Sequence, residues 1–129
     1  MIHTVVARWP LRRRVAFVAL LPVVASWFVL AGRGAATPSA GWLVVALSAS
    51  GLGAAVLASY VPHVGRRPDL GCTPCSTLAA LSLVGATIAL TTYRGEVVGP
   101  LVATAVLLFG LTQRVGQTAS CAAPVRGPR

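Results

Sequence analysis

The sequence predicts an all-α integral membrane protein, in which four transmembrane helices form an up-down bundle with both termini in the cytoplasm. Of its 129 residues, 56% are hydrophobic and 10% are charged, whereas a soluble domain is about one quarter charged. The apolar residues form four runs of 17 to 20 residues, close to the roughly 20 that cross a hydrocarbon core about 30 Å thick. Arginines lie between these runs, where they indicate topology.

The distribution of arginine sets the expected orientation. The net charge of +9 comes from eleven arginines and no lysine, against Asp69 and Glu96. Nine arginines fall in the N-terminal segment, the central loop and the C-terminal segment, and the other two loops carry Arg33 and Arg94. The positive-inside rule therefore places both termini and the central loop in the cytoplasm of a multi-pass protein of the cell (inner) membrane. Because the arginines flank apolar runs, nucleic acid is not an expected partner.

The N-terminal half is expected to hold two spans. Residues 1–14 form a basic cytoplasmic segment, and residues 15–32 form the first span, although an apolar run after arginines also fits a signal peptide. Residues 42–61 form the second span, with Trp42 and Tyr60 as interfacial aromatic residues.

The C-terminal half completes a membrane domain over residues 15–113. Residues 77–93 form the third span and residues 97–113 the fourth, and residues 114–129 have too little apolar surface to fold and form a disordered cytoplasmic tail. Small residues repeat along one face of the second and third spans, at Ala46, Ser50, Ala54 and Ala58 and at Ala79, Ser82, Ala86 and Ala89. Such faces allow close approach of helices in lipid, so these two spans are expected to pack together.

The motif Cys72-Thr73-Pro74-Cys75 is the one place where reactive side chains lie at a chemically useful spacing. Pro74 suits the first turn of a helix and Thr73 can cap it, so the third helix is expected to begin here. A helix N-terminus favours thiolate over thiol. Two thiols at this spacing can bind a soft metal or form a small disulfide, whereas a stable disulfide is not expected in a reducing cytoplasm. The alternative is that both cysteines are packing residues.

The same topology brings further metal ligands to the cytoplasmic side. His63 and Cys121 would complete a Cys3His set for zinc or another soft metal with Cys72 and Cys75. His3 lies on the same side and is a weaker candidate. One CxxC is half of a usual zinc signature.

Three short resemblances concern the cysteine pair. Cys-x-Pro-Cys resembles the redox motif of thioredoxin-like proteins over four residues. A four-helix membrane protein with CxxC at a helix start resembles the quinone-linked thiol oxidoreductases of the vitamin K epoxide reductase type, which implies a redox pair at Cys72 and Cys75 beside a quinone; a second, shuttling pair is absent. Residues 71–90 also resemble the small mercury-carrier membrane proteins, which implies a thiol relay, although the first two spans lack cysteine.

Other chemistry has little support in the sequence. The four expected spans contain no Asp, Glu, Lys, Arg or His, so an ion-coupled transporter is not expected. Phosphate-binding loops and paired carboxylates are also missing from the sequence. We therefore expect a small non-enzymatic protein, in contact with the lipid bilayer and with other membrane subunits as an accessory subunit, whose CxxC binds a soft metal or makes a redox-sensitive contact. The alternatives are a membrane thiol oxidoreductase that uses a quinone and a small thiol-based metal carrier.

Overall fold

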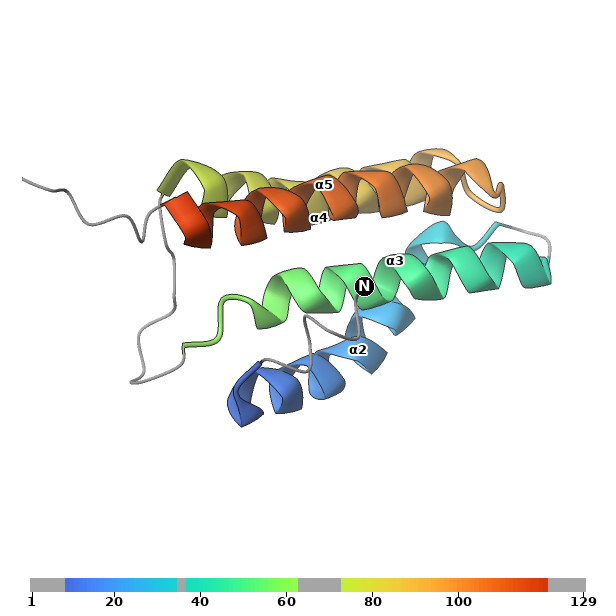
Figure 1. Cartoon of the computed structure of the whole chain (residues 1–129). Helices are drawn as coiled ribbons and strands as arrows, with labels where there is room; N and C mark the ends of the chain where they lie inside the picture. The colour runs from blue at the N-terminus through green and yellow to red at the C-terminus, as the bar shows by residue number, and fades with distance from the viewer. Residues whose placement is uncertain (1–8, 35–36, 63–72, 121–129) are drawn as a thin grey trace, which may run out of the picture.

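The computed structural model of the protein describes residues 9–34, 37–62 and 73–120, and all regular secondary structure among them is α-helix. Four helices follow one another there: α2 (Leu11–Gly32), α3 (Ala40–Ala58), α4 (Thr73–Thr92) and α5 (Val98–Ser120) (Figure 1). The predicted all-α class is confirmed, and each helix coincides with one predicted apolar run.

Each helix extends beyond its predicted span at one end, and two of these extensions carry charged residues. α2 begins at Leu11, so the arginines at positions 12–14 belong to its first turn. α5 continues to Ser120, so the prediction of a structureless tail from residue 114 is wrong for residues 114–120. Counting apolar residues finds where a helix leaves lipid, whereas the backbone hydrogen bonds of the helix continue into the aqueous boundary. The rest of the predicted tail, residues 121–129, lies outside the described residues.

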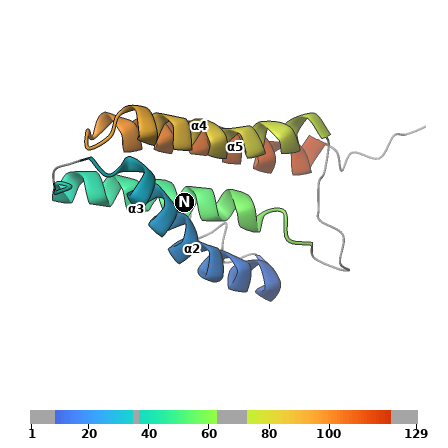
Figure 2. The same cartoon turned by 180° about the vertical axis from the view of Figure 1, so that it is seen from behind.

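The four helices are arranged as two hairpins joined through α3 and α5. α2 packs mainly on α3, α4 packs mainly on α5, and a large α3–α5 contact holds the hairpins together. α2 meets α4 over a smaller surface, and α3 and α4 barely contact each other. The prediction that the second and third spans are close neighbours is therefore wrong. α3 and α5 run in the same direction, and α4, which comes between them in the chain, runs in the opposite direction beside α5 (Figures 1 and 2).

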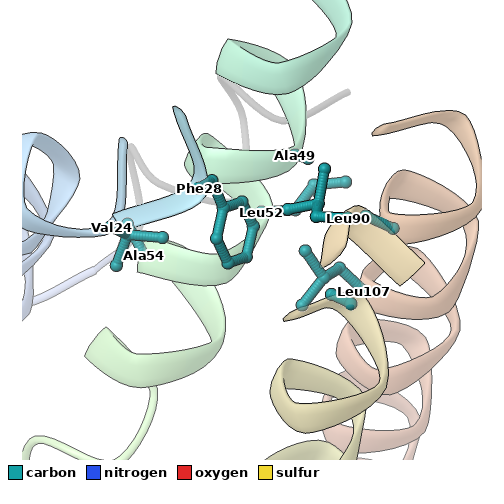
Figure 3. Packing of buried hydrophobic residues seen from close by; sticks show 9 residues of the cluster. Val24, Phe28, Ala49, Leu52, Ala54, Leu90 and Leu107 are labelled. Carbon is teal, nitrogen blue, oxygen red and sulfur yellow. The ribbon is translucent and has the colours of Figure 1, made fainter. Parts of the chain in front are cut away.

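The core lies where the four helices meet. Phe28 of α2 points between Leu52 of α3 and Leu90 of α4, with Leu107 of α5 close by (Figure 3). The two predicted small-residue faces are indeed buried. Their partners differ from the prediction, because α5 also presents small residues to its neighbours. Gly110 of α5 approaches Ser82 of α4 so closely that a Cβ atom at position 110 would lie 2.7 Å from the Ser82 Cβ atom.

The outer surface is apolar around the bundle. Large hydrophobic side chains are exposed on all four helices, among them Val18, Trp27, Val44, Leu47, Leu81, Ile88, Leu101 and Phe109. In the described part of the chain, three helical stretches are long and apolar enough to cross a membrane: Leu11–Gly32, Ala40–Ala58 and Val98–Gly116. The apolar stretch of α4, Ser76–Thr92, is shorter. A surface of this kind is stable in lipid rather than in water, which supports a membrane protein.

Hydroxyl groups within the helices bond to their own backbone. Ser50 Oγ donates to the Ala46 carbonyl at 2.8 Å, and Thr104 Oγ1 donates to the Pro100 carbonyl at 2.7 Å. Lipid offers no hydrogen-bond partners, so these local bonds remove the desolvation penalty of burying a hydroxyl group.

Glycines close the end of the bundle that holds the α2–α3 and α4–α5 connections. The Gly95 N–H donates to the Gly32 carbonyl at 3.0 Å, which ties the α4–α5 turn to the end of α2. Gly95 has φ +78°, a left-handed conformation that side chains disfavour. Gly34 passes so close that a Cβ atom there would lie 3.2 Å from Gly95 Cα.

Gly32 is expected to be sensitive to any side chain. A Cβ atom there would lie 2.7 Å from Cζ2 of Trp42, whose rigid indole is fully buried. Gly32→Ala should therefore lower the free energy of unfolding by about 1 to 2 kcal/mol, as overpacking does. Detergent-solubilised protein titrated with SDS and followed by circular dichroism measures this. Gly51→Ala, which meets no atom within 4 Å, is the control; equal stability of the two variants would contradict the prediction.

Candidate functional site

The predicted thiol site lies at the start of α4. This helix begins at Thr73, which places Pro74 and the backbone of Cys75 in its first turn, as the motif predicted. The side chain of Cys75 lies outside what the structure describes, as do the whole of Cys72, His63 and Cys121 and also His3. The structure thus fixes the helix that carries the pair, and the ligand set stays a prediction.

Three residues join the helices beside this helix start, and we call Tyr60, Ser76 and Arg114 the end cluster. Tyr60, just after α3, donates its hydroxyl hydrogen bond to the Ser76 carbonyl at 2.5 Å. The Arg114 guanidinium of α5 lies over the Tyr60 ring, with Cζ 4.7 Å from the ring centroid. Ser76 directly follows Cys75, so the end cluster holds the first turn of α4 against α3 and α5.

Arg114 is the residue that sequence reasoning missed. Ending the fourth span at Gln113 put Arg114 in a tail, whereas it lies within the apolar stretch Val98–Gly116 and is only 9% exposed. Its signal was present in the sequence: Ala103, Leu107 and Gly110 are buried at spacings of four and three residues, and position 114 continues that face. A buried arginine in an apolar helix indicates a specific partner, which here includes the π face of Tyr60.

Further arginines lie at the same end of the bundle. Arg13 Nε donates to the Val61 carbonyl at 2.8 Å, which ties the first turn of α2 to the residues after α3. We call this end, formed by the starts of α2 and α4 and the ends of α3 and α5, the basic end. Its described arginines are Arg12, Arg13, Arg14 and Arg114, whereas Arg33, Arg94 and Glu96 lie at the opposite end. Positive charge and the N-terminus of α4 both favour the thiolate form of a cysteine placed there.

The described residues do not by themselves make a metal centre. Among residues 9–34, 37–62 and 73–120, no three His, Cys, Asp or Glu side chains come together in a way that could hold a metal ion. The predicted set rests on Cys72, Cys75, His63 and Cys121, whose side chains fall outside that description, so it is neither supported nor contradicted.

An apolar groove opens between α2 and α4. Its volume is about 260 Å³, and the residues that line it are Val23, Val24, Trp27, Phe28, Leu57, Leu83 and Thr87. Leu83 follows Cys75 by eight residues, a rise of about 12 Å along the helix. The groove therefore lies deeper in the bundle than the start of α4, where the sparse α2–α4 contact leaves space.

Comparisons with protein families, with curated proteins and with solved structures each give no match to this chain. Function is therefore argued from the residues alone.

Proposed function

We propose that this chain is a four-span protein of the cell membrane whose termini both face the cytoplasm. Three helices are long and apolar enough to span. α3 and α5 run in the same direction (Figure 1), so the chain must return to the first side between them, and α4 makes that return. The apolar stretch of α4, Ser76–Thr92, rises about 26 Å by helix geometry, within a few ångströms of the hydrocarbon thickness. The arginines of the basic end favour the cytoplasmic side for that end.

At the basic end, we propose a non-enzymatic thiol site formed by Cys72 and Cys75. The observation that carries this proposal is the start of α4 at Thr73, which puts the backbone of Cys75 in the first helical turn beside the end cluster. Neighbouring cationic groups and the helix dipole lower the free energy of a thiolate pair, which is the form that binds soft metals such as zinc. His63 and Cys121 are the candidates for the remaining ligands, and the bundle would act as a small accessory subunit of a membrane assembly.

Thiol labelling of the full chain tests on which side of the membrane Cys72 and Cys75 lie and whether they are reduced. For the labelling, in a Cys121→Ser background treated with a zinc chelator, a membrane-impermeant maleimide should label Cys72 and Cys75 in inverted vesicles and not in intact cells, without prior reduction. Zinc is measured in the parent chain that keeps Cys121, where it should be found at about one ion per chain and should be lost in Cys72→Ser/Cys75→Ser. Labelling with no bound metal in the parent would contradict metal binding, and labelling only from outside would overturn the orientation.

The groove between α2 and α4 favours a second candidate, a quinone-linked thiol oxidoreductase. In that reaction the two thiols would form a disulfide and pass two electrons and two protons to the quinone, which leaves as quinol. The groove could hold the apolar tail of a quinone, while its ring would have to lie about 12 Å nearer the α4 start. Labelling that requires reductant, together with quinol formation lost in Cys75→Ser, would favour this candidate over metal binding.

A further inference from the structure

The outward face of α2 is the least covered surface of the bundle. α2 packs mainly on α3 and only sparsely on α4, and Leu11, Val15 and Val18, which share one face of α2, are 76%, 60% and 67% exposed. A shallow hollow of about 360 Å³ lies on this face, formed by Arg14, Val15, Val18 and Ala19. One edge of the hollow is thus cationic and the remainder is apolar.

Positive charge gathers where this face meets the basic end. Arg12 and Arg14 are both exposed. Arg14 Nε donates to the Trp9 carbonyl at 2.9 Å, so the Arg14 guanidinium extends toward the residues that precede α2. Of the two acidic residues in the chain, Glu96 lies at the opposite end and Asp69 lies outside the described residues. A single carboxylate cannot neutralise the four described arginines of the basic end, so this end attracts anions.

We propose that an anionic phospholipid binds here, with its phosphate at Arg12 and Arg14 and an acyl chain in the hollow below. The groups of the hollow are arranged in the order that a lipid requires: the Arg14 guanidinium nearest the helix start, then Val15, Val18 and Ala19. One leaflet is about 15 Å deep, which corresponds to about ten helical residues below Arg14. Trp9 packs edge-to-face on Phe17, with ring centroids 6.3 Å apart, at the level that interfacial tryptophans occupy. The proposal rests on membrane insertion and does not involve the cysteine pair.

Quenching of tryptophan fluorescence by brominated lipids tests it. The full chain is reconstituted in vesicles of phosphatidylcholine with phosphatidylglycerol, and either lipid carries brominated acyl chains. Resistance of the reconstituted chain to carbonate extraction reports insertion independently of quenching, so failure of insertion is distinguished from failure of this proposal. The wild type should prefer phosphatidylglycerol, by about fivefold for each arginine that contacts it.

Two variants of equal charge separate a site from general attraction. Arg12→Gln/Arg14→Gln should lower the preference at least about fivefold, whereas Arg33→Gln/Arg94→Gln, at the opposite end, should keep it. Equal loss in both variants, no preference in the wild type, or displacement by inorganic phosphate beyond the effect of sodium chloride at equal ionic strength would overturn the proposal. Little quenching by either lipid despite proven insertion would also overturn it, because another protein would then cover this face.

Discussion

Gly110→Val is expected to lower the free energy of unfolding by about 3 kcal/mol, at the upper end of the usual cost of overpacking. A Cβ atom at position 110 would overlap Ser82 Oγ and lie 2.7 Å from Ser82 Cβ. Ser82 is 5% exposed and its hydroxyl donates to the Ala79 carbonyl at 2.7 Å, so it has no space into which to move. Relief would require α4 and α5 to separate, which would disrupt the closest helix pair of the bundle.

A matched variant on the same helix tests the cause. Gly116→Val adds the same side chain at a position where no atom lies within 4 Å, so it should change stability by less than about 0.5 kcal/mol. SDS titration in detergent micelles, followed by circular dichroism, gives both values. Ser82→Gly introduced into Gly110→Val should recover at least half of the loss, since it removes the overlapping atoms. Equal destabilisation by Gly110→Val and Gly116→Val would mean that the low helix propensity of valine, and not the close contact between α4 and α5, causes the loss of stability.

Arg114→Ala is expected to have the second-largest effect, a loss of about 2 kcal/mol, from the desolvated cation–π contact with Tyr60 and from the buried apolar stem of the side chain. Because the Tyr60 hydroxyl in turn bonds to the Ser76 carbonyl, the loss should concentrate at the basic end. Exchange of the first hydrogen-bonded amides of α4, from Thr77 onward, should accelerate by about thirtyfold, the equivalent of that free energy.

The control for Arg114 is an exposed arginine at the other end. Arg33→Ala should leave exchange in α4 unchanged. Arg114→Ala combined with Tyr60→Leu should cost less than the sum of the two single changes, because both remove the same contact. Additive costs would show that Arg114 stabilises the protein through other neighbours. Unchanged exchange at the start of α4 would show that the end cluster does not stabilise the helix turn that carries the proposed thiol site.

The sequence predicted the helices because apolar runs and proline positions report local structure. Pro74 marked the start of α4, and the stripes through Ala46 and Ala79 marked which faces are buried. A small-residue stripe says that another helix comes close and does not say which one, so the pairing of α3 with α5 was missed. The stripe of α5 contains Gly110, whose approach to Ser82 decided that α4 packs there.

The candidate site was predictable only in part. The position of CxxC at a helix start followed from Thr73 and Pro74, and the structure agrees for the backbone of Cys75. The role of Arg114 was missed because counting a span ends at the first charged residue, although an arginine can place its guanidinium over an aromatic ring while its stem stays in apolar surroundings. The prediction that His63 and Cys121 complete a ligand set stays open.

The pairing of α2 with α3 and of α4 with α5 has a consequence for how the protein assembles in a membrane. Each pair is a helical hairpin with a short connection, so each could enter the bilayer as a unit. In that order of assembly, the α3–α5 surface would form last, by lateral docking of two hairpins already in lipid. Stability within a hairpin and association between hairpins are therefore separable quantities, and a change such as Gly110→Val acts on the first before it reaches the second.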